Sequence, residues 1–75
     1  MSELDLLIEY GKILKKYRKS LNLSQEKFAL KIGMDRTYYA SVESGKRNIS
    51  FHNIIKISEG LEVKTSDIFK EIEEL

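Results

Sequence analysis

The chain has 75 residues, of which 41% are hydrophobic and 33% charged, with a net charge of +1. This composition predicts one small globular domain and excludes a disordered segment. Cysteine is absent, which excludes disulfides, thiolate metal sites and cysteine nucleophiles. No apolar run approaches the roughly 20 residues that span a bilayer, and the acidic start of the chain differs from a signal peptide. We therefore expect a cytoplasmic protein without a membrane segment.

The first predicted helix covers residues 4 to 20. Its apolar residues recur at the spacing of one buried helical face, at Leu7, Leu14, Tyr17 and Leu21. Gly11 interrupts the helical propensity of this segment and would permit another helix to pack closely. Asn22 and Leu23 form the connection to the next helix.

The second predicted helix begins after Ser24, whose hydroxyl can accept a hydrogen bond from an orphan backbone N–H. Phe28, Ala29 and Ile32 then repeat at the spacing of a buried face. Gly33 follows the last apolar residue, where a helix often ends in a left-handed backbone conformation.

The third predicted helix runs from Arg36 to about Ser44, with Asp35 as its cap and Gly45 as its stop. A helix, a short glycine-containing turn and a second helix form the DNA-binding helix-turn-helix pattern, here at residues 24 to 45. In this motif the second helix enters the major groove.

Two further helices complete the prediction. Ser50 can cap a helix from Phe51 to about Gly60, in which Phe51, Ile54, Ile55 and Ser58 line one face. Thr65 or Ser66 can cap a last helix, with Asp67 near its positive dipole end. The last helix carries an apolar stripe that exceeds the needs of so small a body, and we expect residues 51 to 75 to form a homodimer interface through Ile68, Phe69, Ile72 and Leu75. The alternative is packing of the stripe onto the first and fourth helices, above all through Ile68 and Phe69.

The charges are distributed unevenly along the chain. Residues 12 to 47 contain ten of the 13 basic residues and three of the 12 acidic residues, so this window carries +7 and the remainder −6. Solvated helix faces alone could account for such an asymmetry. Because the basic window coincides with the helix-turn-helix, a surface that binds DNA phosphates is the better interpretation.

The segments LSQEKFALKIGM, DRTYYASVESGKRN and LEVKTSDIF resemble the lambda-repressor-like, or Xre, family of helix-turn-helix regulators. Within that family, RTYYASVESGKRNIS is most similar to the small controller proteins of restriction–modification systems. The resemblance implies an all-α, compact five-helix domain spanning residues 1 to 75. It also implies a homodimeric transcription regulator, acting as repressor or activator, that binds a palindromic operator.

The family pattern and the helical register together predict the DNA contacts. On the recognition helix, the base contacts fall at Asp35, Arg36, Thr37, Ala40 and Ser41. Backbone contacts fall at Gln25, Tyr38, Lys46, Arg47 and Asn48, whereas Tyr39 and Val42 point inward. Arg18 and Glu43 resemble a structural ion pair that joins the first and third helices of related repressors.

Other functions find little support in the residues. His52, the single histidine, has no neighbouring ligands at metal-binding spacing, and we expect neither a metal site nor enzymatic activity. We also expect no cofactor and no small-molecule ligand. Double-stranded DNA is the expected partner, with a nucleoid location, and acidic surface residues could contact RNA polymerase. Two alternatives stay open, an antitoxin-type or adaptor module that binds a protein, and a stand-alone phage-type repressor.

Overall fold

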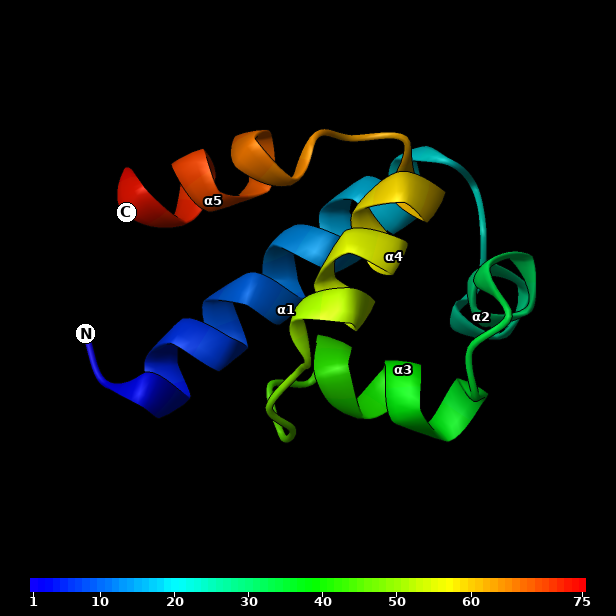
Figure 1. The fold of residues 1–75 in the computed structure, drawn as a ribbon, viewed down its shortest axis with the longest axis horizontal. Helices are drawn as coiled ribbons and strands as arrows, with labels where there is room; N and C mark the ends of the chain where they lie inside the picture. The colour runs from blue at the N-terminus through cyan, green and yellow to red at the C-terminus, as the bar shows by residue number, and fades with distance from the viewer.

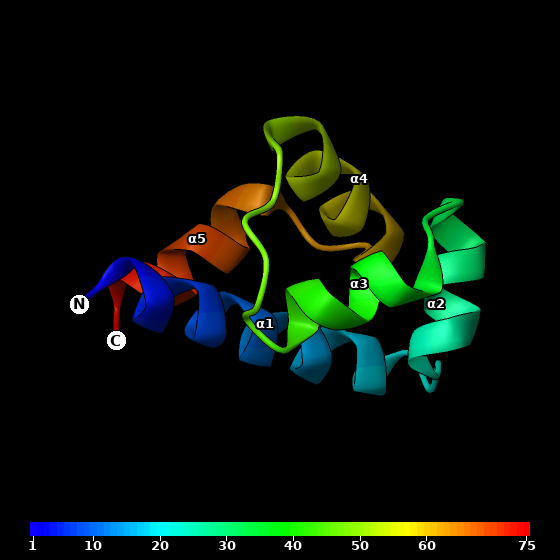
Figure 2. The same ribbon diagram turned by 90° about the horizontal axis from the view of Figure 1, so that it is seen from below.

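The computed structural model describes residues 1–75 and contains five helices and no strand. The helices are α1 (Glu3–Ser20), α2 (Gln25–Ile32), α3 (Arg36–Glu43), α4 (Phe51–Leu61) and α5 (Thr65–Glu73). The predicted all-α, five-helix fold is confirmed. In Figure 1 the long α1 crosses behind α4, with α2 and α3 on one side and α5 on the other. Both termini lie at the end of the molecule remote from α2 (Figures 1 and 2). None of the helices is both long and apolar enough to cross a membrane.

The predicted caps define the helix-turn-helix. The side chains of Ser24, Asp35 and Ser50 each accept a hydrogen bond from the backbone N–H three residues later, at 2.9 to 3.2 Å. Gly33 has a φ of +64°, the left-handed conformation expected where α2 ends. The turn between α2 and α3 therefore follows from local sequence.

The start of α5 differs from the prediction. The N-cap is Lys64, which makes no side-chain cap bond, and Thr65 and Ser66 already lie in the first turn. Asp67 lies in this turn as predicted, where its negative charge interacts favourably with the positive end of the helix dipole. Ile68, in the same turn, is completely buried. The start of α5 is therefore fixed by packing in the core, without a hydrogen bond from a capping hydroxyl.

The core draws residues from all five helices. Its ten buried hydrophobic residues are Tyr10, Ile13, Leu14, Phe28, Ala29, Tyr39, Val42, Ile57, Leu61 and Ile68. The rings of Phe28 and Tyr39 lie 4.9 Å apart between centroids, in the tilted arrangement that aromatic pairs favour. A Cβ atom on Gly11 would lie 2.1 Å from the carbonyl oxygen of Glu43. Gly11 therefore permits the close approach of α1 and α3, as predicted.

A buried carboxylate joins the first three helices. Glu43, 8% exposed, accepts two hydrogen bonds from the guanidinium of Arg18, from Nε at 2.7 Å and from Nη2 at 2.9 Å. The hydroxyl of Tyr39 and the side-chain amide of Gln25 also donate to this carboxylate. Arg18 in turn donates from Nη1 to the carbonyl oxygen of Leu23, in the connection between α1 and α2. The network thereby ties α3 to α1 and to the start of α2.

The network determines the charge state of Glu43. Burial disfavours the ionised carboxylate, but the donors on Arg18, Tyr39 and Gln25 outweigh burial and hold the pKa of Glu43 below its usual range. Burial and the bond to Glu43 raise the pKa of the Tyr39 hydroxyl, which therefore keeps its proton. Glu43 is thus an anion surrounded by donors.

Replacing this carboxylate should destabilise the protein. Glu43→Gln leaves the nearly buried charge of Arg18 without a counter-ion, and we expect the free energy of unfolding to fall by about 3 kcal/mol or more. Because the pKa of Glu43 is lower in the folded state than in the unfolded state, its contribution is present above the unfolded pKa. That contribution is lost as the pH falls below 4.5, the ordinary pKa of the group.

Urea unfolding at several pH values measures both effects. The matched control is Glu59→Gln, at an exposed position with no ion pair, which should change stability by less than about 0.5 kcal/mol. The acid-dependent loss should be smaller in Glu43→Gln than in the wild type. Equal stabilities for the two variants, or an unchanged pH profile, would contradict the role assigned to Glu43.

Candidate nucleic-acid interface

The outer face of α3 is formed by the predicted base-contacting residues. Arg36 and Thr37 are exposed, and Ala40 and Ser41 lie half-buried one turn later on the same side. Tyr39 and Val42 are 0% and 1% exposed, so the opposite side of the helix faces the core, as predicted. Figure 2 shows α3 on the near face of the molecule, packed along α1 and α2. The first turn of α3 is therefore free to approach a ligand.

Asp35 and Arg36 have different local roles. The Oδ2 atom of Asp35 accepts the backbone N–H of Tyr38 at 2.9 Å, so this carboxylate is already engaged as the helix cap. Arg36 approaches Glu26 of α2, with 3.5 Å between Nη1 and Oε2. About two-thirds of each side chain is exposed, so the ion pair contributes little and Arg36 can exchange it for another acceptor.

The loop after α3 places its cations beside the same face. Lys46, Arg47 and Asn48 are all exposed, and the side chains of Lys46 and Asn48 make no hydrogen bond. Arg47 reaches back to α3, where its Nε donates to the hydroxyl of Ser41 at 3.1 Å. Its guanidinium carbon also lies 5.0 Å from the centre of the Tyr38 ring, within cation–π range. The structure thus brings Tyr38, Ser41 and Arg47 together.

Gln25, which was predicted to contact the DNA backbone, has a second role. Its Nε2 donates to Oε1 of Glu43 at 3.0 Å, and the side chain is half-buried between α2 and α3. Its backbone N–H lies in the first turn of α2, where the free N–H groups of a helix favour an anion. A phosphate contact by Gln25 therefore remains a prediction. In the structure its side-chain amide nitrogen is hydrogen-bonded to Glu43.

An apolar groove lies on another part of the surface. It measures about 330 Å³ and is lined by seven hydrophobic residues and one acid, contributed by α1, α4, α5 and the loop before α4: Leu6, Leu7, Tyr10, Ile49, Ile54, Phe69, Ile72 and Glu73. Phe69 and Ile72 belong to the predicted dimer contacts, and Leu75, two residues beyond the end of α5, is exposed. Ile68 is 0% exposed and packs in the core, so it has no surface to offer a partner and that part of the prediction is corrected.

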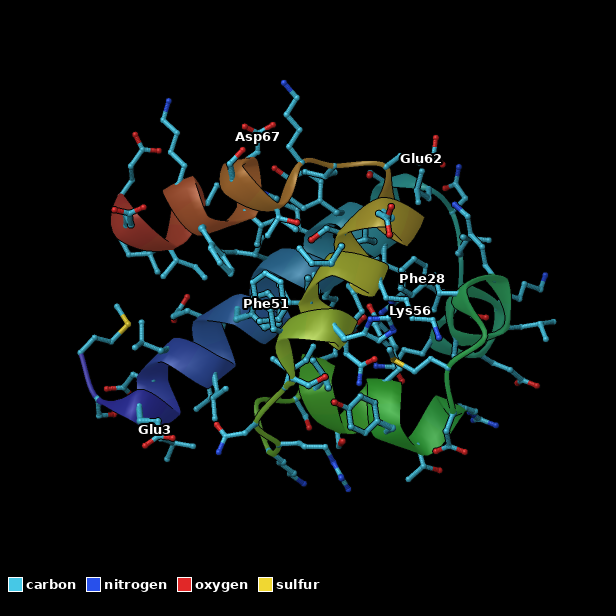
Figure 3. All side chains as sticks on the ribbon, viewed as in Figure 1. Glu3, Phe28, Phe51, Lys56, Glu62 and Asp67 are labelled. Carbon is cyan, nitrogen blue, oxygen red and sulfur yellow. The ribbon has the colours of Figure 1, made fainter.

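Some residues beside these surfaces were not predicted from the sequence. Phe51, predicted to share one face of α4 with Ile54, Ile55 and Ser58, is 78% exposed, and Figure 3 shows its ring at the start of this helix. Glu26 and Asn53 contact predicted DNA-binding residues, and Tyr10 belongs to the groove. These positions depend on how the helices cross, for which the local sequence carries no signal.

The structure contains no cluster of three His, Cys, Asp or Glu side chains that could hold a metal ion. His52 is exposed at the start of α4. Apart from the capping carboxylate of Asp35 and the small Ala40, the side chains on the surface of α3 and its following loop are polar or cationic. This arrangement suits the recognition of phosphates and of base edges.

The chain resembles proteins of known type along most of its length. The helix-turn-helix family model matches residues 14–68. The control protein C.MunI from a Mycoplasma species is 53% identical over 70 residues, which cover 92% of this chain and 95% of that protein.

Two solved structures of controller proteins share the fold. The restriction–modification controller protein C.AhdI from Aeromonas hydrophila superposes with a TM-score of 0.80 and 38% identity, over 84% of this chain and 96% of that one. The controller protein C.Esp1396I, solved as a tetramer with its natural 35 base-pair operator, gives a TM-score of 0.82 and 32% identity, over 92% of this chain and 91% of that one. The chain described here therefore belongs to the helix-turn-helix family and is a relative of the restriction–modification controller proteins.

Proposed function

We propose that this protein is a controller of a restriction–modification system that binds a palindromic DNA operator as a homodimer and regulates transcription. The observation that carries the proposal is the exposed side of α3, where Arg36 and Thr37 present donors, with Arg47 of the following loop held beside them, while the other side of the helix is fixed in the core. The operator complex of the relative C.Esp1396I supports it.

The exposed donors divide into two classes by position. Arg36 lies in the first turn of α3, where a guanidinium can bind O6 and N7 of guanine, a contact worth about 1–3 kcal/mol of discrimination. Thr37, Ala40 and Ser41 would face the base pairs further along the major groove of the DNA, and Asp35 would lie beside them. Lys46, Arg47 and Asn48 would bind phosphates together with Gln25 and Tyr38, which positions the protein without reading sequence.

A second copy of the chain is the proposed occupant of the apolar groove. One recognition helix reads only a few base pairs, whereas a two-fold dimer reads two half-sites about 34 Å apart. In such a dimer the same surface of both copies meets, so a side chain beside one groove can enter the other. Phe51 is suited to this role, because it lies one turn before the groove residue Ile54 and is 78% exposed.

RNA polymerase is a further proposed partner. A dimer that overlaps a promoter would exclude polymerase, whereas a dimer bound upstream could recruit it. Acidic residues are concentrated outside the basic window, where the net charge is −6. A contact with polymerase would therefore use a surface other than the outer face of α3.

The test of DNA recognition is the selection of bound duplexes from a random library, followed by sequencing. We expect the wild-type protein to enrich two inverted half-sites at a fixed spacing. Arg36→Ala should relax the preference at one base pair in each half-site. Arg47→Ala should weaken binding to all duplexes and reduce the slope of log affinity against log salt by about one.

The paired arginine variants control for each other, since each removes one positive charge from the same surface. An unchanged sequence preference in Arg36→Ala would mean that the register assigned to α3 is wrong. Enrichment of no sequence by the wild type, with only salt-sensitive background binding, would contradict the function itself.

The dimer surface can be tested with charges placed at exposed apolar positions. Phe51→Glu puts a carboxylate beside the groove and should shift the protein from dimer to monomer in sedimentation velocity at micromolar concentration. The matched control is Leu30→Glu, on α2 and away from the groove, where the wild-type side chain is 82% exposed. A Phe51→Glu protein that remains as dimeric as Leu30→Glu would place the dimer interface elsewhere.

A further inference from the structure

Asn53, in the first turn of α4, connects this helix to the recognition helix α3. Its side-chain Nδ2 donates to the hydroxyl oxygen of Tyr38 at 3.1 Å. Its own backbone is fixed, because its N–H donates to the hydroxyl of Ser50, the cap of α4, at 3.2 Å. Both Asn53 and Tyr38 are half-buried, so this bond lies at the edge of the core and is partly shielded from water.

Tyr38 in turn supports Arg47. The guanidinium lies against the Tyr38 ring at 5.0 Å and donates through Nε to Ser41. The Ser41 hydroxyl also donates to the backbone carbonyl of Tyr38 at 2.7 Å. An exposed arginine in a loop would otherwise sample many rotamers, at a cost in conformational entropy when it binds a ligand. Here the ring and the serine hydroxyl hold the arginine against the outer face of α3.

The phenol of Tyr10, on α1, lies near that of Tyr38. The Tyr10 hydroxyl is buried and has no hydrogen-bond partner, and burial together with the nearby phenol of Tyr38 raises its pKa. The Tyr38 hydroxyl has one hydrogen bond within the protein, the one from Asn53. Since Asn53 donates this bond, the proton of the Tyr38 hydroxyl remains free for an external acceptor such as a phosphate.

We propose that Asn53 is a positioning residue of the DNA interface, which acts through Tyr38 to hold Arg47 in the orientation that binds a phosphate. The inference rests on the proposed function, because Tyr38 and Arg47 are the DNA-backbone contacts of that proposal. Asn53 itself needs no contact with DNA. In this arrangement α4 helps to set the geometry of a surface that α3 and the following loop present.

A double-mutant cycle tests whether Asn53 acts through the Tyr38 hydroxyl. The dissociation constant for the selected duplex is measured for the wild type, Asn53→Ala, Tyr38→Phe and the double variant. We expect Asn53→Ala to weaken binding about fivefold, as for the loss of one net hydrogen bond, and to have no further effect when Tyr38→Phe is present. The salt slope of Asn53→Ala should fall toward that of Arg47→Ala.

Two variants guard against a purely structural effect. His52→Ala changes the exposed neighbour on the same turn and should bind as the wild type does. Asn53→Leu keeps the number and branching of the side-chain heavy atoms but has no donor, so it should reproduce the loss in affinity if the alanine variant unfolds. Equal losses for Asn53→Ala with and without Tyr38→Phe would overturn the proposal, because Asn53 would then act independently of Tyr38. Unchanged binding in both Asn53 variants would also overturn it.

A measurement on the free protein separates this inference from the proposed function. The Nε–H signal of Arg47 in an NMR spectrum reports whether its guanidinium is held, and we expect it to become motionally averaged in Asn53→Ala. If the wild type selects no duplex, the proposed function fails, but this signal still decides whether Asn53 holds Arg47. If the protein binds DNA and the signal is identical in the wild type and Asn53→Ala, the positioning role fails alone.

Discussion

The buried carboxylate of Glu43 joins the first three helices and fixes α3 against α1 and α2. Four donors on three side chains, those of Arg18, Gln25 and Tyr39, converge on it, and they come from α1, α2 and α3. An ion pair of this kind adds little stability compared with apolar packing, but breaking it leaves a charge stranded in the core. Its consequence is geometric. The recognition helix is held at one angle against its neighbours, and Gly11 lets α1 approach closely enough to do so.

The helices then divide the surface into two regions with different chemistry. The outer face of α3 and its following loop is polar and basic, whereas the groove between α1, α4 and α5 is almost entirely apolar. Helix α4 contributes to both regions, since Asn53 donates to Tyr38 beside the proposed DNA-binding face and Ile54 lines the apolar groove. The spacing of two recognition helices in a dimer would therefore depend on the same helix that supports the phosphate contact of each copy.

The features that could be predicted from the sequence are those that depend on neighbouring residues. The caps at Ser24, Asp35 and Ser50 and the turn at Gly33 follow from local hydrogen bonding and backbone freedom, and the structure contains all four. The inward side of α3 follows from the helical period. Features that depend on the crossing of helices could not be predicted in this way. They include the second role of Gln25, the exposure of Phe51 and the bond from Asn53 to Tyr38. Ile68 was misassigned because an apolar stripe does not say which of its residues the protein itself covers.

In the proposed function, α1, α2 and α3 hold the start of α3 and the following loop in position to bind DNA. This can be tested by NMR titration of the protein with a duplex that carries its selected sites. We expect the largest amide shifts at residues 35 to 41 and 46 to 48, with little change in the core around Glu43. Large shifts confined to the groove residues of α1 and α5, with none in α3, would contradict it.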